Sequence, residues 1–424
     1  MTNATLFYYT KMTQPEQILE DNLVAQLQTL SYSFVAIKDE RELLANLKTQ
    51  IEKHNNISLS AKEFDRVLNI LNKGSVFEKA RTLREKQHIL KDNGDSLYFQ
   101  FIEQENWCQN QFQVTRQVSI EGTYKNRYDV TILINGLPLV QVELKRRGLE
   151  LKEAFNQTNR YQRHSYGSSA GLFQFVQIFV ISNGVNTKYY ANNKSQSFKQ
   201  TFYWSDQHNN PVTQLEQFAF CFLDTCHVSK MICKYIVLSE AYRIPMVLRP
   251  YQYYAVEALI ERVKDTNKNG YIWHTTGSGK TLTSFKASQI LMNLPQVKKV
   301  VFVVDRKDLD YQTSREFDSF SKGSVDSASN TEDLVKKFSD DTKLIVTTIQ
   351  KLNTAIFKSQ YLSRMMKLKD ERIVFIFDEC HRSQFGETHN RIKAFFNNIQ
   401  LFGFTGTPIF ADNAVKNELE AKFQ

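Results

Sequence analysis

The sequence has little cysteine and no long apolar run, and both absences narrow its class. No apolar stretch approaches the roughly 20 residues that a membrane-spanning helix requires. Residues 1–14 lack the order of basic and then apolar residues that marks a secretory signal. No internal repeat or low-complexity tract is present. We therefore expect a cytoplasmic protein that does not associate with a membrane.

The cysteine set is odd in number and sparse, since only five cysteines occur in 424 residues. This count fits a reducing compartment better than a disulfide scaffold. Cys221, Cys226, His227 and Cys233 lie close together in the sequence, but their spacing is not the C-x₂-C of a structural zinc site. They fall in an apolar helical pattern over 215–238, so we interpret them as buried thiols, with zinc as the alternative.

The composition is that of an ordinary globular chain, with 42% hydrophobic and 23% charged residues. At 424 residues the chain is long enough for two or three domains, each with its own core. The net charge of +9 is compatible with a polyanionic partner. Charge alone is weak evidence, because many basic proteins bind no nucleic acid.

The most specific motif lies in residues 271–281, where an apolar run, a glycine-containing turn and a helix-compatible segment follow one another. This order is typical of a phosphate-binding loop, in which backbone N–H groups and a helix N-terminus surround a polyphosphate. A Gly/Ser loop that happens to precede a helix is the alternative, and His274 stands where the general pattern has glycine. The lysine would reach the β- and γ-phosphates, and the last threonine would ligate Mg²⁺. The residues expected to bind nucleotide here are Thr276, Gly277, Ser278, Gly279, Lys280 and Thr281.

Residues 127–145 form the second informative stretch, because two β-rich runs flank Asn-Gly at 135–136, a strong hairpin signal. Asp129 lies on the first run, while Glu143 and Lys145 are two residues apart and project from one face of the second. This is the residue set of a metal-dependent nuclease. Asp129 and Glu143 would hold Mg²⁺, and Lys145 would orient or help to deprotonate the attacking water. An ordinary hairpin with a solvated Glu–Lys face is the alternative.

The pairing register of this hairpin tests the nuclease interpretation. A two-residue turn at 135–136 would place position 129 opposite position 142 and turn Asp129 away from Glu143. A three-residue loop over 135–137 with a bulge would place the two acids directly opposite each other. We therefore predict the bulged loop, or an equivalent break at Asp129.

Further motifs surround the phosphate-binding loop. The buried-strand pattern at 373–377 ends in Asp378 and Glu379, at the strand end where α/β folds place their chemistry. Asp378 would bind Mg²⁺ through water, and Glu379 would polarise the water that attacks the γ-phosphate. The alternative is a helix N-cap followed by a first-turn acid. Upstream, Gln252 is expected to contact adenine, although its segment also reads as a helix start marked by proline.

The remaining segments give a coarse outline of secondary structure. Residues 1–125 are expected to be mostly helical, and 173–181 is expected to be a strand that extends the sheet of the hairpin. Apolar runs at 299–305 and 343–348 predict parallel strands buried on both faces. A domain boundary is expected near 240–247.

Together these motifs resemble the helicase superfamily 2 set. Gln252 resembles the Q motif, and the loop at 277–281 resembles motif I. Motif II is similar to the DECH form at 378–381. The further matches are Asp305, Arg306 and Gln312 for motif Ia, Thr347, Thr348 and Gln350 for Ib, and Thr405 to Thr407 for III. Preceded by an Asp/Glu-x-Lys segment, the order resembles the restriction (motor and nuclease) subunits of type I restriction–modification enzymes, in which His274 is usual.

The resemblance implies further site residues and a domain plan. It adds Glu20 as an upstream acid, and it adds Gln157 and Tyr161, which lie four residues apart on one helix face and support DNA positioning. It implies an α/β fold, with a PD-(D/E)xK-type endonuclease domain over 1–245 and a first RecA-like helicase domain over 246–424.

The resemblance also sets expectations for activity. Family members continue into a second RecA-like domain whose arginines complete the ATP site, so we expect a fragment that hydrolyses ATP poorly. The expected cofactors are ATP and Mg²⁺. The expected partners are double-stranded DNA and the methyltransferase and specificity subunits, since no base-reading motif is evident.

The leading functional hypothesis is therefore an ATP-driven DNA translocase with an attached endonuclease. The alternative is an ATP-dependent remodelling or repair motor whose first domain binds DNA without cutting it. A nucleotide-regulated scaffold is disfavoured, because Lys280, Asp378 and Glu379 are all present.

Overall fold

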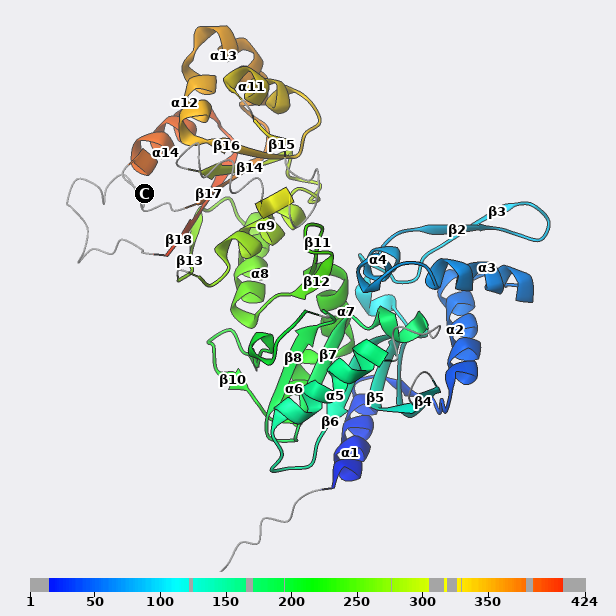
Figure 1. Ribbon diagram of the computed structural model, residues 1–424. Helices are drawn as coiled ribbons and strands as arrows, with labels where there is room; N and C mark the ends of the chain where they lie inside the picture. The colour runs from blue at the N-terminus through cyan, green and yellow to red at the C-terminus, as the bar shows by residue number, and fades with distance from the viewer. Residues whose placement is uncertain are drawn as a thin grey trace, which may run out of the picture. The chain divides into compact units, whose positions relative to one another are not determined.

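The structure is a computed structural model in which two compact units are distinguished. It describes residues 15–121, 125–164, 171–193, 195–275, 277–304, 316–318, 326–328, 330–378 and 384–406. The first unit comprises Met1–Leu238 with Ile244–Pro250, and the second comprises Ser239–Arg243 with Tyr251–Gln424. Figure 1 colours the first unit blue to green and the second mainly yellow-green to red.

A six-stranded mixed sheet forms the centre of the first unit, in the order β1-β4-β5-β6-β7-β8. The β1/β4 and β6/β7 pairs are parallel, and the other neighbours are antiparallel. Its strands are Ser33–Phe34 (β1), Phe112–Glu121 (β4), Lys125–Ile134 (β5), Leu137–Leu144 (β6), Ile178–Ser182 (β7) and Thr187–Ala191 (β8). Every residue of β6 and β7 is buried, which explains their rows of branched and apolar side chains.

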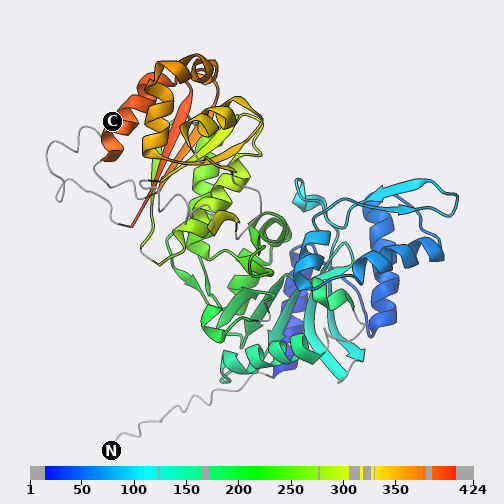
Figure 2. The same ribbon diagram turned by 45° about the horizontal axis from the view of Figure 1, so that its top comes forward.

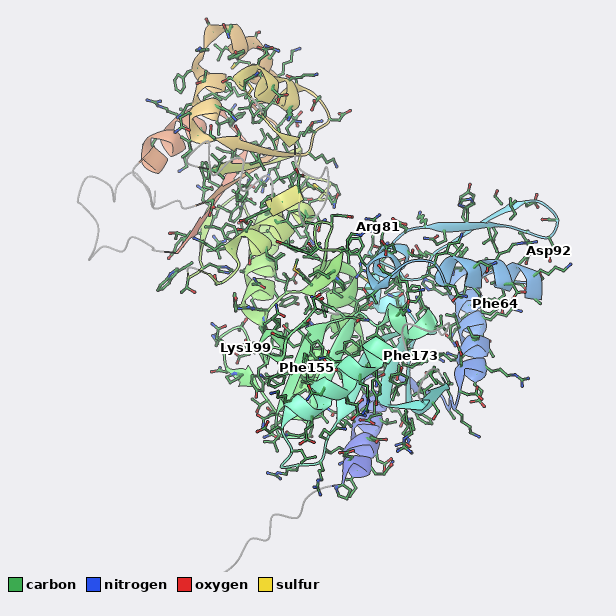
Figure 3. The ribbon with its side chains drawn as sticks, viewed as in Figure 1. Phe64, Arg81, Asp92, Phe155, Phe173 and Lys199 are labelled. Carbon is green, nitrogen blue, oxygen red and sulfur yellow. A yellow bond between two sulfur atoms is a disulfide. The ribbon has the colours of Figure 1, made fainter. Side chains whose placement is uncertain are left out.

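Helices cover both faces of this sheet. Adjacent residues of a strand point to opposite faces, so the contacts of Tyr189 and Tyr190 on β8 identify which helix lies on which side. The Tyr189 ring packs against Phe222 of α6 (Leu215–Phe222), with ring centroids 4.6 Å apart. The Tyr190 ring packs against Phe155 of α5 (Leu151–His164) at 5.3 Å, and Figure 3 labels Phe155 on that helix. Helix α1 (Glu16–Thr29) packs beside α6.

The remaining helices of the first unit begin at good capping residues. Asp39 accepts a hydrogen bond from the Glu42 amide at the start of α2, and Ser60 forms a capping box with Glu63 at the start of α3. These helices are α2 (Glu40–Asn55), α3 (Ala61–Leu71), α4 (Val76–Thr82) and α7 (Thr225–Lys230), with 3₁₀ turns η1 (Trp107–Gln109), η2 (Gly171–Phe175) and η3 (Phe198–Gln200), and a π-helical turn η4 (Met231–Tyr235). Short two-stranded sheets are β2 (Gln87–Leu90) with β3 (Ser96–Phe99), β9 (Trp204–Ser205) with β10 (Pro211–Val212), and β11 (Ile236–Ser239) with β12 (Ile244–Val247).

Three expectations of secondary structure are wrong in part. The mostly helical prediction for residues 1–125 fails after α4, where β2, β3 and β4 follow. The strand expected at 173–181 begins as the 3₁₀ turn η2 and becomes extended only at Ile178. The helical pattern expected to reach residue 238 ends at Tyr235 and continues as β11.

The cysteines also depart from expectation. Cys108 and Cys226 form a disulfide, and Cys221 is exposed, so the prediction of buried thiols is wrong for Cys226 and Cys221. Cys233 is partly buried, and burial raises its pKa to about 11. Within the described ranges, no group of three His, Cys, Asp or Glu side chains could hold a metal, which removes the zinc alternative for this segment.

The second unit contains a parallel six-stranded sheet in the order β13-β18-β17-β14-β16-β15. Its strands are Gly270–Trp273 (β13), Lys299–Val304 (β14), Asp326–Ser327 (β15), Leu344–Thr348 (β16), Ile373–Asp378 (β17) and Ile399–Thr405 (β18). Its helices are α8 (Pro250–Asp265), α9 (Lys280–Leu291), α11 (Thr331–Ser339), α12 (Ile349–Phe357), α13 (Ser359–Met365) and α14 (Gln384–Phe395), with a 3₁₀ turn η5 (Met366–Leu368). Figure 2 shows the strands of this sheet running between helices.

Both faces of the parallel sheet are covered. Val301 and Val303 of β14 belong to a core shared with α11, α12, α13 and α14. Phe302, which points the other way, contacts Phe317, and Phe317 in turn contacts Phe285 of α9. This two-sided burial explains the continuous apolar strands of the sequence. In the part of the chain that is described, no helix is long and apolar enough to cross a membrane.

Candidate functional site

The hairpin of β5 and β6 brings the two predicted acids together, by a different route from the one expected. Its turn has only two residues, Asn135 and Gly136, with φ of 50° and 82°. The register then shifts between Ile132 and Leu133, so that Leu139 is an extra residue in β6. The predicted three-residue loop is therefore wrong. Beyond the shift, Val130 pairs with Val142, and the same register continued by one residue places position 129 opposite position 143.

Asp129 and Glu143 form a buried carboxylate pair on one face of the sheet. Asp129 is 9% exposed and Glu143 is 0% exposed. The Leu144 amide donates to Asp129 Oδ2 at 2.8 Å, and Glu143 Oε2 has no hydrogen-bond partner among the described residues. Burial raises the pKa of Asp129, and burial together with the Asp129 charge raises the pKa of Glu143 well above its usual value.

This pair fits a divalent cation. Two buried carboxylates repel each other, and an unpartnered buried oxygen carries a desolvation cost that a bound cation would remove. No third His, Cys, Asp or Glu completes a ligand set in the described ranges. Such a pair suits Mg²⁺, which binds through one or two carboxylates and keeps several waters.

Glu20 of α1 lies beside this pair. It is 4% exposed; burial raises its pKa, and the Asp129 charge adds to the rise. Gln117 of β4 donates its side-chain amide to Glu20 Oε2 at 2.6 Å. Gln117 has a left-handed φ of 58° and lies between the pairs 116–130 and 118–128, which places it opposite Asp129. Gln117 was not predicted as a site residue, because nothing in the neighbouring residues marks a glutamine that adopts this backbone conformation.

Lys145 lies just after the last residue of β6, on the same side as Glu143. Its ammonium lies 3.4 Å from Glu143 Oε1 and donates to the Leu144 carbonyl at 2.8 Å. Glu16 of α1 is a second carboxylate near this ammonium, at 4.0 Å, and it also accepts from the Arg146 amide at 3.2 Å. Glu16 was missed as well, although it lies one helical turn before Glu20 and could have been found by that spacing.

Gln157 and Tyr161 lie one helical turn apart on α5 and contact each other. The Gln157 amide donates to the Tyr161 hydroxyl, which itself donates to the Arg127 carbonyl at 3.0 Å. Burial raises the pKa of Tyr161, with a further contribution from the charge of Glu143. The pair therefore attaches α5 to the segment that leads into Asp129.

The glycine loop of the second unit follows β13 and ends at α9. Gly277 and Gly279 have φ of 77° and 83°, a left-handed conformation that glycine adopts without strain. The Ser278 amide and hydroxyl both donate to the Thr275 carbonyl, at 3.1 and 2.6 Å. Helix α9 begins at Lys280, and Thr281 follows it as a partly buried first-turn residue. Thr276 lies outside the described residues.

Gln252 of α8 supports the loop backbone. It is 3% exposed, and its amide donates to the Ser278 and Gly279 carbonyls at 3.2 and 3.4 Å. The Tyr251 hydroxyl donates to the same Ser278 carbonyl at 2.7 Å. A contact between Gln252 and adenine stays a prediction.

The side chain of His274, just before the glycine loop, is buried. It is 5% exposed, and burial together with the charge of Lys280 lowers its pKa to about 4, so the ring is neutral. Its amide donates to the Thr405 carbonyl of β18 at 2.9 Å. A neutral, packed ring thus stands where the general motif has glycine.

Strand order brings the glycine loop and Asp378 to one edge of the second sheet. Trp273 pairs with Thr405, and Asp378 pairs with Phe404, so β18 alone separates the loop strand from the Asp378 strand. All three strands are parallel and end at this edge. Thr348 accepts from the Lys351 amide at 3.3 Å as the N-cap of α12, also at the carboxyl end of its strand. Glu379, His381, Asp305, Arg306, Gln312 and Thr407 lie outside the described residues.

Two protein families match separate parts of the chain. Residues 13–198 match the family described as type I restriction enzyme R protein N terminus, and residues 251–424 match the SWI2/SNF2 ATPase family. A type I restriction enzyme SauMRSORF196P endonuclease subunit of Staphylococcus aureus is 52% identical over 95% of this chain and 43% of its own length. The chain thus spans less than half of that relative.

Two shorter relatives are covered more fully. The type I restriction enzyme EcoprrI endonuclease subunit of Escherichia coli is 35% identical over 61% of this chain and 85% of its own length. A Mycoplasma pneumoniae protein, described as the C-terminal part of a type I restriction enzyme MpnIIP endonuclease subunit, is 47% identical over 46% of this chain and 99% of its own length.

Proposed function

The chain belongs to the family of type I restriction enzyme endonuclease subunits, and on that premise we propose that it couples ATP-dependent translocation of double-stranded DNA to Mg²⁺-dependent endonucleolytic cleavage. The observation that carries the nuclease half is the buried Asp129–Glu143 pair with the Lys145 ammonium 3.4 Å from Glu143. The parallel sheet with a glycine loop and Asp378 at one edge supports the ATPase half.

In the nuclease centre, Asp129 and Glu143 would hold the cation, with Glu20 beside them. Mg²⁺ supplies, when bound, a Lewis acid that activates water and the scissile phosphate. The Leu144 amide fixes Asp129, so that carboxylate keeps one orientation. Lys145 is held between Glu143 and Glu16, where its ammonium can orient the attacking water and stabilise charge on the phosphate.

In the motor unit, the loop 277–279 would surround the phosphates of ATP, with Thr276 completing its backbone. Lys280 would contact the β- and γ-phosphates, and Thr281 and Asp378 would hold Mg²⁺ directly and through water. Glu379 would polarise the attacking water. Gln252 donates to the carbonyls of Ser278 and Gly279, and these bonds would hold the peptide units that follow them in position for the phosphates.

The partners proposed for the chain are double-stranded DNA and the methyltransferase and specificity subunits of a type I complex. The net charge of +9 favours phosphate contacts, whose contribution does not depend on sequence. Sequence choice would then belong to the specificity subunit.

The test measures DNA cutting and ATP hydrolysis separately, with this chain alone and with the chain assembled with its partner subunits. Lys145→Ala should abolish cutting and leave ATP hydrolysis by the complex intact. Lys280→Ala should abolish hydrolysis. A remodelling motor that only grips DNA would predict no cutting by the unmodified chain in either setting, and that result would remove the nuclease half.

A further inference from the structure

A hollow of about 610 Å³ lies next to the candidate nuclease centre, at the carboxyl ends of β6 and β7. It is bounded by the segment 147–152 between β6 and α5, by the turn 183–186 between β7 and β8, and by Lys188, Phe198 and Tyr203. Ligand sites in sheets with parallel strand pairs occur at this end of the strands. None of the residues assigned to nuclease or ATPase chemistry lines it.

The lining of the hollow is basic. Arg147, Lys152 and Lys188 come from three different elements and converge on it, while Glu150 is the single acid among its described lining residues. A concave site with net positive lining concentrates polyanions, because its walls focus the field of the cations. The charge therefore favours phosphate groups as the ligand.

Two aromatic rings hold one of these cations in place. The Lys188 ammonium lies 4.9 Å from the ring centroid of Phe198 and 4.7 Å from that of Tyr203. Burial lowers the pKa of Lys188 because it removes water from the ammonium, and an anion bound beside it would favour the charged form. Tyr203 is 36% exposed, and its hydroxyl donates to Asn186 Oδ1 at 3.3 Å. The ring is thus fixed in orientation and still offers surface for stacking.

The sheet register relates this hollow to the nuclease centre. Glu143 pairs with Ile181, and Ile181 pairs with Lys188, so these three residues form one row across β6, β7 and β8 on the same face. Strands lie about 4.8 Å apart, which puts the Lys188 backbone roughly 10 Å from that of Glu143. Arg147 follows Lys145 by two residues, and it also lines a second hollow of about 660 Å³ beside α1 and α6.

We propose that this hollow is a nucleotide subsite of the nuclease centre, occupied by the DNA strand next to the bond that is cut. Arg147, Lys152 and Lys188 bind backbone phosphates, and Tyr203 stacks on a base of the duplex that is unpaired beside the cut, as aromatic side chains do in sequence-tolerant binding of single strands. The proposal rests on the proposed nuclease function and names where its substrate strand lies.

The test measures binding of a fluorescently labelled single-stranded oligonucleotide to the whole chain by anisotropy, with Ca²⁺ in place of Mg²⁺ and at several salt concentrations. Lys188→Ala and Arg147→Ala should each weaken binding about 10-fold and lower the salt slope by about 0.7, the signature of one lost phosphate contact. Lys188→Arg should retain most of the binding. Tyr203→Ala should weaken binding about 10-fold, whereas Tyr203→Phe keeps the ring and should not.

Lys73→Ala is the matched control, because Lys73 is an exposed lysine just after α3 and its loss changes the net charge equally. If Lys188→Ala and Arg147→Ala bind the oligonucleotide with the same affinity and the same salt dependence as Lys73→Ala, the subsite proposal is wrong. If Lys188→Ala melts early, Arg147→Ala decides, since that side chain is exposed. Plasmid cutting by the same proteins distinguishes failure of the subsite from failure of the nuclease function. If cutting still depends on Lys145, the nuclease function is supported even when the subsite is refuted. A chain that neither binds nor cuts DNA removes both.

Discussion

Asp129 and Glu143 face each other because Leu139 is an extra residue in β6. Without the register shift between Ile132 and Leu133, the two-residue turn would place position 129 opposite Val142, on the wrong face. The bulge therefore sets the geometry of the carboxylate pair, at a distance of several residues from both acids. Bulges next to active sites commonly redirect a side chain in this way.

The first prediction concerns the charge on Glu143. Glu143→Gln should raise the free energy of unfolding of the metal-free chain by about 1 kcal/mol at neutral pH, because a buried carboxylate beside Asp129 destabilises the fold. The same change should abolish stabilisation by Mg²⁺. Thermal melting with EDTA and with Mg²⁺ measures both effects.

Glu63→Gln is the matched control for this change. Glu63 is also buried, but it accepts from the Ser60 and Asp92 amides, both at 2.9 Å, and these bonds lower its pKa. Its substitution should therefore destabilise the chain and leave the response to Mg²⁺ unchanged. A Glu143→Gln chain that melts earlier than the unmodified chain in EDTA would contradict the carboxylate-pair interpretation.

The second prediction is a pH dependence of stability with a defined sign. The folded-state pKa values of Asp129, Glu143 and Glu20 are raised above unfolded values of about 3.9 for Asp and 4.3 for Glu. The native state therefore binds these protons more tightly. In EDTA, the contribution to stability is fully present below the unfolded pKa values and is lost as pH rises through the folded ones. Denaturant unfolding at a series of pH values should show that the free energy of unfolding falls as pH rises. Saturating Mg²⁺ or the Glu143→Gln substitution should make this fall smaller.

The third prediction concerns Gln117. Gln117→Gly should remove the strain of a left-handed residue, about 1 kcal/mol, and also remove the amide that holds Glu20. The relief of strain and the loss of the hydrogen bond to the buried Glu20 oppose each other, so the free energy of unfolding should change little. The protein should nevertheless need more Mg²⁺ for half-maximal DNA cutting, with a rate reduced about 10-fold. Gln117→Ala should show the same metal dependence and be less stable than Gln117→Gly, because alanine keeps the strain. An unchanged Mg²⁺ requirement in both variants would show that Gln117 does not act on the metal centre.

Much of the fold could be predicted because it depends on periodicity. The helices expected early in the chain, the hairpin at Asn135 and Gly136 and the apolar strands of the second sheet agree with the structure, although the hairpin loop has two residues and not the three predicted. Local patterns of this kind are encoded in neighbouring residues. The position of Asp378 at the carboxyl end of a buried parallel strand also agrees with the expectation from the sequence.

The parts that could not be predicted depend on long-range or irregular geometry. The bulge at Leu139 could not be predicted from the sequence. An apolar residue in an apolar strand looks the same whether or not it is paired with the neighbouring strand. The conformation of Gln117 depends on its neighbours in the sheet, and the Cys108–Cys226 disulfide joins residues 118 positions apart. The roles of all the predicted site residues stay predictions, and positions 276 and 379 lie outside the described residues.

The fourth prediction separates two glycines of the phosphate-binding loop. A Cβ atom on Gly279 would lie 2.6 Å from Gln252 Nε2, whereas one on Gly277 would meet nothing within 4 Å. Both have left-handed φ, so Gly277→Ala carries strain alone and Gly279→Ala carries strain and a clash. Binding of a fluorescent ATP analogue should weaken a few-fold in Gly277→Ala and more strongly in Gly279→Ala, where the Gln252 side chain must also move. Equal losses in the two variants would mean that the packing of Gln252 on the loop does not matter.

The fifth prediction concerns the disulfide between Cys108 of η1 and Cys226 of α7. Closing so long a loop should stabilise the first unit, by about 2–4 kcal/mol, although Asn110 also connects these segments through a hydrogen bond of 3.0 Å to Ser229. Reduction with dithiothreitol should lower the melting temperature without unfolding the unit, and Cys108→Ser should melt like the reduced chain under all conditions. Cys221→Ser is the control, because Cys221 is an exposed free thiol and its loss should change neither value. Peptide mapping without reductant should recover the two linked peptides; recovery of both as free thiols from the oxidised chain would refute the bond.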